Sequence, residues 1–147
     1  MKHDGGQAGP PWREHTVPGL LQTLGPLLSK KQGDQWLYGL HVRQAHLNPA
    51  NVVHGGTLAT LLDHALSTIA WSDSGKTPCM TVQLNVSFLG SAVLGDLLVA
   101  SGQIVRGTGS LLFVTGNIVV NDAIIATAQG ILKCMPAANA ATVPAHS

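Results

Sequence analysis

The sequence has few charged and few aromatic residues. Asp, Glu, Lys and Arg make up 10% of its 147 residues, and aromatic residues make up 4%. The charged share is well below the usual quarter, whereas the apolar share of 45% is ordinary. The net charge of +1, without a dense stripe of Lys and Arg, argues against duplex nucleic acid as a partner. A surface with so little charge indicates burial between subunits, the alternative being a neutral monomer rich in Ser, Thr and Gly.

Cysteine is scarce, and long apolar runs do not occur. Cys79 and Cys134 have neither metal-binding nor redox spacing. Two free thiols in a reducing cytosol is the simpler expectation, and one disulfide is the alternative. The polar segment 1–14 carries no apolar core of a signal peptide. No continuous apolar run has membrane-spanning length, so we expect a soluble, cytoplasmic protein without a membrane partner.

The length fits one domain with a core of its own. Residues 1–33 are expected to form an N-terminal tail and a short helix, and residues 136–147 a flexible C-terminal tail. The domain itself is expected over residues 34–135. The short helix is predicted by leucines at helical spacing, which Gly25-Pro26 should break or kink: Leu20, Leu21, Leu24, Leu27 and Leu28.

The clearest single element is a helix that begins at Gly55-Gly56. Its apolar residues recur at helical spacing and form one stripe: Leu58, Leu61, Leu62, Ala65, Leu66 and Ile69. Turn residues between positions 72 and 78 end this helix. Before it, residues 36–46 predict a strand, and residues 48–51 predict a loop.

After the helix the apolar period changes to two, which is typical of half-buried strands. Strands are expected at residues 80–88, 97–106, 110–120 and 124–135. Their short separators favour antiparallel neighbours in a four-strand meander. One long helix and one antiparallel sheet predict a two-layer α+β domain, with the helix across one face of the sheet.

Asp63 is the unusual residue of the long helix. It shares a narrow polar face with Gly56, Thr60 and Ser67, by i, i+3 and i+4 spacing. If the sheet and a partner subunit enclose the helix, this carboxylate lies in a mostly apolar cleft and is a candidate base. A solvated aspartate on an exposed helix face is the alternative.

The motif His54-Gly55-Gly56 opens the same helix. The first amides of a helix lack intrahelical acceptors and carry partial positive charge. Glycine at this point lets a carbonyl oxygen approach closely, which makes the motif a candidate for holding a developing oxyanion. The alternative is a tight entry from loop to helix.

Two further residues are candidates for positioning. Asn48, six residues before His54, is placed to orient that loop or to donate to a carbonyl, or it is a turn residue before Pro49. Thr81, on the polar face of a predicted strand, is placed to position a water against Asp63, or it is an ordinary strand threonine. The histidines have no zinc-ligand spacing, so no metal site is expected.

Together these residues resemble the hotdog-fold thioesterases, and among them the phenylacetate-pathway (PaaI-like) group of acyl-CoA thioesterases. The resemblance lies in the block 48–63, which joins an asparagine loop, HGG and a helix with aspartate. Later elements of the family are matched by the strand 81–88, by Gly95-Asp96 and by the segment 106–113. The resemblance implies an antiparallel sheet of about five strands around one long helix.

The resemblance also implies a reaction and an assembly. The expected reaction is hydrolysis of an acyl-CoA, with an aryl-acetyl or a short or medium acyl chain, to free acid and CoA. CoA is then part of the substrate, and no cofactor is needed. A homodimer with active sites at its interface is implied, and a homotetramer formed from such dimers.

The resemblance assigns a role to each candidate. Asn48 and His54 would hold the loop and the thioester carbonyl, and the Gly55 amide would polarise that carbonyl. Asp63 of the facing protomer would act as general base or as nucleophile, and Thr81 would orient the water. The expected substrate-binding residues are Gly56, Arg106, Gly107, Thr108, Gly109 and Ser110.

One departure from the family concerns the segment after Phe88. Many relatives carry a basic residue and a proline there, whereas this chain has Leu89-Gly90-Ser91. Arg106 with its turn is the candidate substitute for contacting the CoA phosphates, and Arg43 is a second one.

Two other functions remain open at this point. A hotdog dehydratase or hydratase would act on the acyl chain with a His paired to a carboxylate. A non-catalytic acyl-CoA-binding module would bind the thioester without releasing thiol. The presence of Asp63 after HGG favours hydrolysis over both. Trp71, Met80, Phe88 and the leucines near the helix are candidates to line the acyl tunnel, but a place in the core is the favoured expectation.

Overall fold

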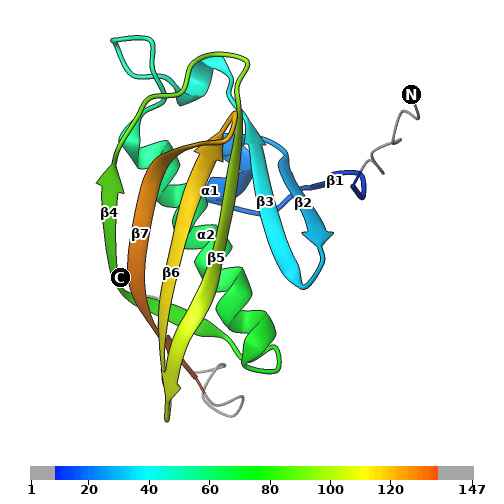
Figure 1. The fold of residues 1–147 in the computed structure, drawn as a ribbon, viewed down its shortest axis with the longest axis vertical. Helices are drawn as coiled ribbons and strands as arrows, with labels where there is room; N and C mark the ends of the chain where they lie inside the picture. The colour runs from blue at the N-terminus through cyan, green and yellow to red at the C-terminus, as the bar shows by residue number, and fades with distance from the viewer. Residues whose placement is uncertain (1–8, 136–147) are drawn as a thin grey trace, which may run out of the picture.

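A computed structural model describes residues 9–135, which form one antiparallel sheet around one long helix (Figure 1). The predicted tail at 136–147 and residues 1–8 lie outside the described part. The helices are α1 (Leu20–Leu24), α2 (Gly55–Asp73) and a 3-10 turn, η1 (Gln44–His46). The strands are β1 (Arg13–His15), β2 (Leu27–Gln32), β3 (Gln35–His41), β4 (Cys79–Phe88), β5 (Leu97–Thr108), β6 (Leu111–Val120) and β7 (Ala123–Cys134).

The strand order is β1-β2-β3-β5-β6-β7-β4, and every pair is antiparallel. The hairpins β5-β6-β7 confirm the predicted antiparallel neighbours. The expectation of a four-strand meander is wrong for β4, which pairs with β7 at the far edge of the sheet. The physical reason is the long connection between Phe88 and Leu97, which lets the chain cross to another strand, whereas two-residue turns do not.

The sheet has seven strands, not the expected five or so, because β1 and β2 extend it. The prediction of helix at Leu27 and Leu28 is wrong, since both lie buried in β2. Helix α1 ends at Leu24 because Gly25 has a positive φ of 103° and proline follows it. The hairpin β2–β3 runs across residue 34, where the sequence places the start of the domain.

The strand predicted over residues 36–46 is correct only in its first part. β3 ends at His41, and the chain then makes the η1 turn. His46 is buried at 1% exposure, and its ring accepts from the Arg43 amide at 2.9 Å and contacts the Leu24 carbonyl at 2.6 Å. These contacts fix the loop that leads to helix α2.

Helix α2 confirms the predicted apolar stripe. Leu58, Leu61, Leu62, Ala65 and Leu66 are buried against the sheet, which curves around them. The helix approaches closely where the sheet carries glycine. A Cβ on Gly102 would lie 2.5 Å from Leu66 Cδ2 and 2.6 Å from a backbone oxygen of β6. Position 102 therefore excludes a side chain, which allows Leu66 of the helix to pack against the sheet.

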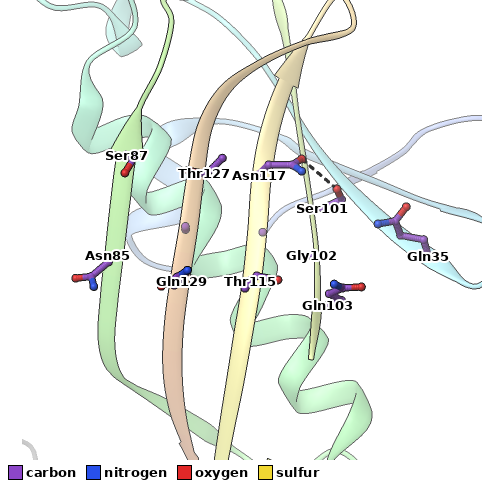
Figure 2. Close-up of a pocket in the computed structure, with 12 residues that line it drawn as sticks. Gln35, Asn85, Ser87, Ser101, Gly102, Gln103, Thr115, Asn117, Thr127 and Gln129 are labelled. Atoms are coloured by element: carbon purple, nitrogen blue, oxygen red, sulfur yellow. Dashed lines mark hydrogen bonds between the residues drawn. The ribbon is translucent and has the colours of Figure 1, made fainter. Parts of the chain in front are cut away.

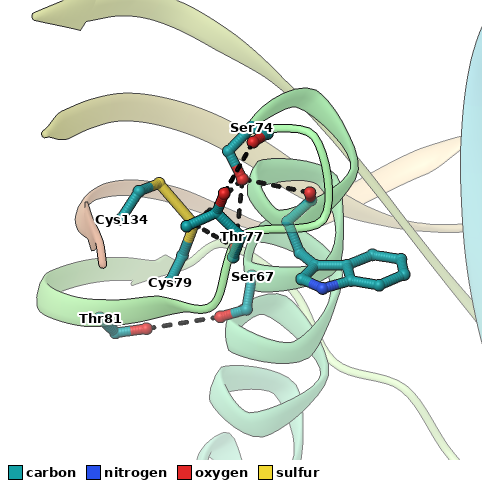
Figure 3. The surroundings of a disulfide bond; sticks show 7 residues. Ser67, Ser74, Thr77, Cys79, Thr81 and Cys134 are labelled. Carbon is teal, nitrogen blue, oxygen red and sulfur yellow. Dashed lines mark hydrogen bonds between the residues drawn. A yellow bond between two sulfur atoms is a disulfide. The ribbon is translucent and has the colours of Figure 1, made fainter. Parts of the chain in front are cut away.

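The two cysteines form a disulfide between the first residue of β4 and the last residue of β7 (Figure 3). Cys79 and Cys134 are direct partners in the antiparallel register, with Cα atoms 4.1 Å apart. The expectation of two free thiols is therefore wrong for this structure. Strand pairing brings the residues together, which their separation of 55 positions in the chain could not reveal.

This disulfide is expected to stabilise the fold by constraining the unfolded chain. Because it closes a loop of 55 residues, replacing both cysteines with serine should lower the free energy of unfolding by about 4 kcal/mol. Guanidinium unfolding with and without reductant measures this loss. The double serine variant is the control, because reductant should leave its stability unchanged. A wild-type chain with two reactive thiols under non-reducing, denaturing conditions would contradict the expectation.

Helix α2 is the longest helix, and neither it nor any other helix in residues 9–135 is both long and apolar enough to cross a membrane.

Candidate functional site

Asp63 lies half-buried on the outward face of α2, on the side that meets β4. Its Oδ1 accepts a hydrogen bond from the Thr81 hydroxyl at 2.7 Å. The Ser67 hydroxyl lies 3.5 Å from the same threonine oxygen (Figure 3). The structure thus brings Thr81 directly to the carboxylate. That Thr81 also orients a water stays a prediction.

The HGG motif forms the N-terminus of α2. The backbone carbonyl of His54 accepts from the Thr57 amide at 2.9 Å, and the His54 ring nitrogen Nδ1 accepts from the Gly56 amide at 2.8 Å. His54 is therefore the N-cap residue. Among the described residues no acceptor reaches the Gly55 amide, so this first amide of the helix is open.

Phe88, the last residue of β4, lies over Gly55. A methyl group on Gly55 would be 3.1 Å from the ring carbon Cζ of Phe88. Phe88 is 54% exposed, and Met80 and Trp71 are also exposed. The favoured expectation that these three side chains belong to the core is therefore wrong, and their role in an acyl tunnel stays a prediction.

The Asn48 loop holds the start of α2 in place. Asn48 Oδ1 accepts from the amides of Ala50 at 2.9 Å and Val52 at 3.3 Å. The amide of His54 donates to the His46 carbonyl at 2.8 Å. These are the bonds of an asparagine that shapes its own turn, which was the alternative for Asn48, and donation by Asn48 to a thioester carbonyl stays a prediction.

Within one chain, the Gly55 amide and the Asp63 carboxylate are too far apart to act on the same substrate carbonyl group. They are eight residues apart on a continuous helix, which separates them by roughly 12 Å along its axis. A general base and an oxyanion donor must both lie about 3 Å from the reacting atoms. One chain therefore carries both the candidate base and the candidate oxyanion donor, but too far apart to act on one carbonyl.

The turn from Arg106 to Ser110 lies away from HGG. It contains the last three residues of β5 and the two-residue turn to β6, and the Ser110 carbonyl accepts from the Cys134 amide at 2.7 Å, at the disulfide end of the sheet. Phe88 and Gly55 lie at the opposite end of β4. Arg43 is engaged elsewhere, because its Nη2 donates to the Leu24 carbonyl at 2.6 Å. Contact of this turn with CoA stays a prediction.

Two titratable side chains next to α2 have shifted pKa values. Burial raises the pKa of Tyr38 to about 12. Burial also lowers the pKa of His64, although the neighbouring Asp63 carboxylate opposes this shift. Tyr38 was not among the predicted residues, since a tyrosine in a β-strand carries no distinguishing pattern. No group of three His, Cys, Asp or Glu in residues 9–135 is arranged to hold a metal ion.

The outer face of the sheet carries a separate hollow of about 650 Å³ (Figure 2). Its polar lining consists of uncharged amide and hydroxyl side chains, among them Asn85, Gln103, Thr115, Asn117 and Gln129. It lies on the opposite face of the sheet from α2 and does not include Asp63. This hollow is not part of the candidate site.

An antiparallel sheet wrapped around one long helix, with HGG at the helix start and aspartate two turns later, defines the hotdog thioesterase class. The sequence profile of the Thioesterase superfamily matches residues 50–125. This chain belongs to the Thioesterase superfamily. The predicted hotdog fold and thioester-hydrolase class are thereby confirmed.

Individual relatives agree with this assignment. A candidate esterase of Pseudomonas aeruginosa is 29% identical over 114 residues, which cover 76% of this chain and 85% of that protein. Acyl-coenzyme A thioesterase 13 of Mus musculus is 27% identical over 99 residues, covering 66% and 70%. A solved structure from Ralstonia eutropha, a candidate thioesterase related to phenylacetic acid degradation, is 26% identical. It has a TM-score of 0.71 and covers 80% of this chain and 90% of its own.

Proposed function

We propose that this protein hydrolyses acyl-CoA thioesters to a free acid and CoA. The observation that carries the proposal is the pair of complementary groups on α2: a carboxylate held by a threonine hydroxyl, and an open amide at the helix start. A thioester needs one base and one oxyanion donor. The identity with a mouse acyl-coenzyme A thioesterase supports CoA as the leaving thiol.

The active site is composed of two protomers in this proposal. The separation of roughly 12 Å between Gly55 and Asp63 along one helix supports this proposal, because a second copy would complete each site. Edge strand β4 supports the pairing, because it is ten residues long and exposes Met80 and Val82 beside the site. An exposed apolar edge of this kind is a surface that another strand covers. Assembly of dimers into a tetramer stays a prediction.

The reaction proceeds by addition to the carbonyl carbon and loss of the thiolate. The Gly55 amide of one protomer donates to the carbonyl oxygen as it gains negative charge. Asp63 of the other protomer takes a proton from water as the water oxygen bonds to the carbon. The C–S bond then breaks as the carbonyl re-forms, which releases the CoA thiolate. The Thr81 hydroxyl donates to Oδ1 of Asp63, which leaves Oδ2 of Asp63 available to accept a hydrogen bond from the water. Attack by Asp63 itself, followed by hydrolysis of the anhydride, is the second route.

The remaining parts of the proposal follow the sequence predictions. Gly56 and the turn from Arg106 to Ser110 are the proposed CoA contacts, and no cofactor beyond the substrate is required. A dehydratase would need a His paired with a carboxylate. The His54 ring instead accepts from the Gly56 amide and caps the helix, which favours hydrolysis. A cytoplasmic location remains the expectation.

A thiol-release assay over a panel of aryl and alkyl acyl-CoAs tests the proposed function, with Asp63→Ala as control. Wild-type protein should release CoA from at least one member, and the variant should not. If every thioester stays intact while the protein is folded, the enzyme proposal fails. Tight binding without release would indicate a binding module, and loss of water from a hydroxyacyl-CoA would indicate a dehydratase.

A further inference from the structure

The disulfide between Cys79 and Cys134 lies close to the threonine that contacts the candidate base (Figure 3). Cys79 is the first residue of β4, and Thr81 follows two positions later in the same strand. The Thr81 hydroxyl donates to Oδ1 of Asp63 at 2.7 Å and lies 3.5 Å from the Ser67 hydroxyl. A covalent link at Cys79 therefore restrains the short segment that places this hydroxyl against the carboxylate.

The sheet itself holds this segment, residues 79–81, only weakly. β4 is an edge strand, so within the sheet of residues 9–135 it pairs with β7 alone. The register with β7 shifts between Thr81 and Gln83, which separates the first three pairs of the ladder from the rest. Such a shift disrupts the ladder locally, so the longer part of β4 does little to hold its first residues. The disulfide adds a restraint at the first of these pairs.

The surroundings of the Cys79 sulfur also suit a free thiol. The Thr77 carbonyl oxygen lies 3.3 Å from Cys79 Sγ, and the Ser74 hydroxyl lies 3.6 Å from it. A thiol is a weak hydrogen-bond donor, whereas a disulfide sulfur carries no hydrogen, so the carbonyl can accept only after reduction. Cys79 and Cys134 are both partly exposed, which leaves them accessible to small thiols. This end of the sheet therefore accommodates the oxidised and the reduced pair.

Thiol–disulfide exchange with a small disulfide such as oxidised glutathione interconverts the two states. The thiolate of one cysteine bonds to a sulfur of the small disulfide, whose S–S bond breaks and releases one thiolate. The thiolate of the second cysteine then attacks the protein sulfur of the mixed disulfide and releases the other thiolate. The protein thus loses two electrons and two protons, and the small disulfide gains them as two thiols. Reduction reverses both steps.

We propose that the Cys79–Cys134 disulfide positions Thr81 at Asp63 and makes the rate of thioester hydrolysis sensitive to redox conditions. This inference rests on the proposed thioesterase function, in which Asp63 is the base. In the oxidised protein, Thr81 holds the carboxylate and hydrolysis is fast. In the reduced protein, the end of β4 separates more readily from β7, the hydroxyl leaves Asp63 more often, and hydrolysis slows. In a reducing cytosol, the location expected for this protein, disulfides are usually transient, which favours a switch over a permanent link.

The first test measures kcat and KM of the intact protein in both redox states. A phosphine reductant, removed before the assay, gives the reduced form, and oxidised glutathione gives the oxidised form. Thioester absorbance follows hydrolysis, because a thiol reagent would also react with the free cysteines. Reduction should lower kcat about tenfold, as loss of the Thr81 hydrogen bond would, and should change KM less than about twofold. Equal kcat values in two forms whose redox states mass spectrometry confirms would overturn the inference.

The variant Thr81→Val separates positioning from a general loss of folded protein. It lacks the hydroxyl, so its kcat should already be about tenfold low and should change less than about twofold on reduction. If reduction acts by unfolding the protein, wild type and variant should lose activity by the same factor. That result would contradict the positioning role.

Replacing both cysteines with serine is the matched control for the exchange chemistry. The double variant should have the kcat of the reduced protein and should respond neither to the reductant nor to oxidised glutathione. A double serine variant as active as the oxidised wild type would also overturn the inference, while the proposed hydrolysis would stand. Failure of wild type in both redox states on every thioester would instead remove the proposed function.

Discussion

Replacing Asp63 with asparagine is expected to lower kcat for acyl-CoA hydrolysis by about 10²–10⁴-fold, the usual contribution of a general base. Asparagine has nearly the same shape and keeps an oxygen for the hydroxyl of Thr81, which donates at 2.7 Å. It cannot take a proton from water. Steady-state kinetics with a thiol reagent measure the loss, and KM should change little because the substrate contacts remain.

The matched control for this variant is Thr81→Val, which removes the hydroxyl next to the carboxylate and keeps the shape. Its kcat should fall less, about tenfold, because Asp63 remains a base but is held less firmly. An Asp63→Asn protein that is folded, oligomeric and fully active would show that the base lies elsewhere.

Replacing Gly55 with proline is expected to lower kcat by about 10²–10³-fold, as loss of one oxyanion-hole donor does. Proline deletes the open amide, and the first position of a helix tolerates it. The preceding residue is already compatible, because His54 has φ −61° and ψ 136°, the extended region that precedes proline. The fold should therefore survive while the donor is lost.

Gly55→Ala is the control for the proline variant. It adds the same Cβ, which would lie 3.1 Å from the Phe88 ring, but it keeps the amide. Phe88 is exposed and free to shift, so kcat should fall only a few-fold. Equal losses in the alanine and proline variants would assign the effect to crowding at Phe88 and contradict the oxyanion role of the amide.

A single-turnover reaction in oxygen-18 water separates the two routes for Asp63. With a general base, the heavy oxygen enters the released acid and the protein stays unlabelled. With a nucleophile, water that opens the anhydride at the Asp63 carbonyl carbon leaves the label in the Asp63 carboxylate after the first turnover, whereas water that attacks the acyl carbonyl carbon labels the released acid. Label in Asp63 therefore identifies the nucleophile route. Mass spectrometry of the peptide that contains Asp63 distinguishes these results.

The elements with strong periodicity were predictable from the sequence. The stripe that begins at Leu58 predicted α2, the alternation over residues 80–88 predicted β4, and the short separators between the later strands predicted the β5-β6-β7 hairpins. Other features depend on contacts between distant segments. The leucines at 27 and 28 continue a helical spacing, and only the pairing of their segment with β1 and β3 makes them a strand. The edge position of β4, and hence the Cys79–Cys134 disulfide, follows from pairing with β7.

The candidate site was predictable as a set of residues but not as a geometry. The resemblance to thioesterases placed Asp63, HGG and Thr81 in one site, and the structure shows Thr81 bonded to Asp63. That the Gly55 amide stays open depends on the orientation of the His54 ring, which caps Gly56 instead. The burial of Tyr38 was not predicted, because it depends on contacts between distant segments that leave this β3 residue 6% exposed.

The most direct test of the two-protomer site mixes two inactive chains, Asp63→Asn and Gly55→Pro. In a mixed dimer, one of the two sites combines the intact Asp63 of one chain with the intact Gly55 of the other. Co-expression with two affinity tags isolates that species, which should regain about half of the wild-type kcat for each dimer. Activity that stays at the level of the separate variants, in a dimer shown to contain both chains, would contradict the shared site.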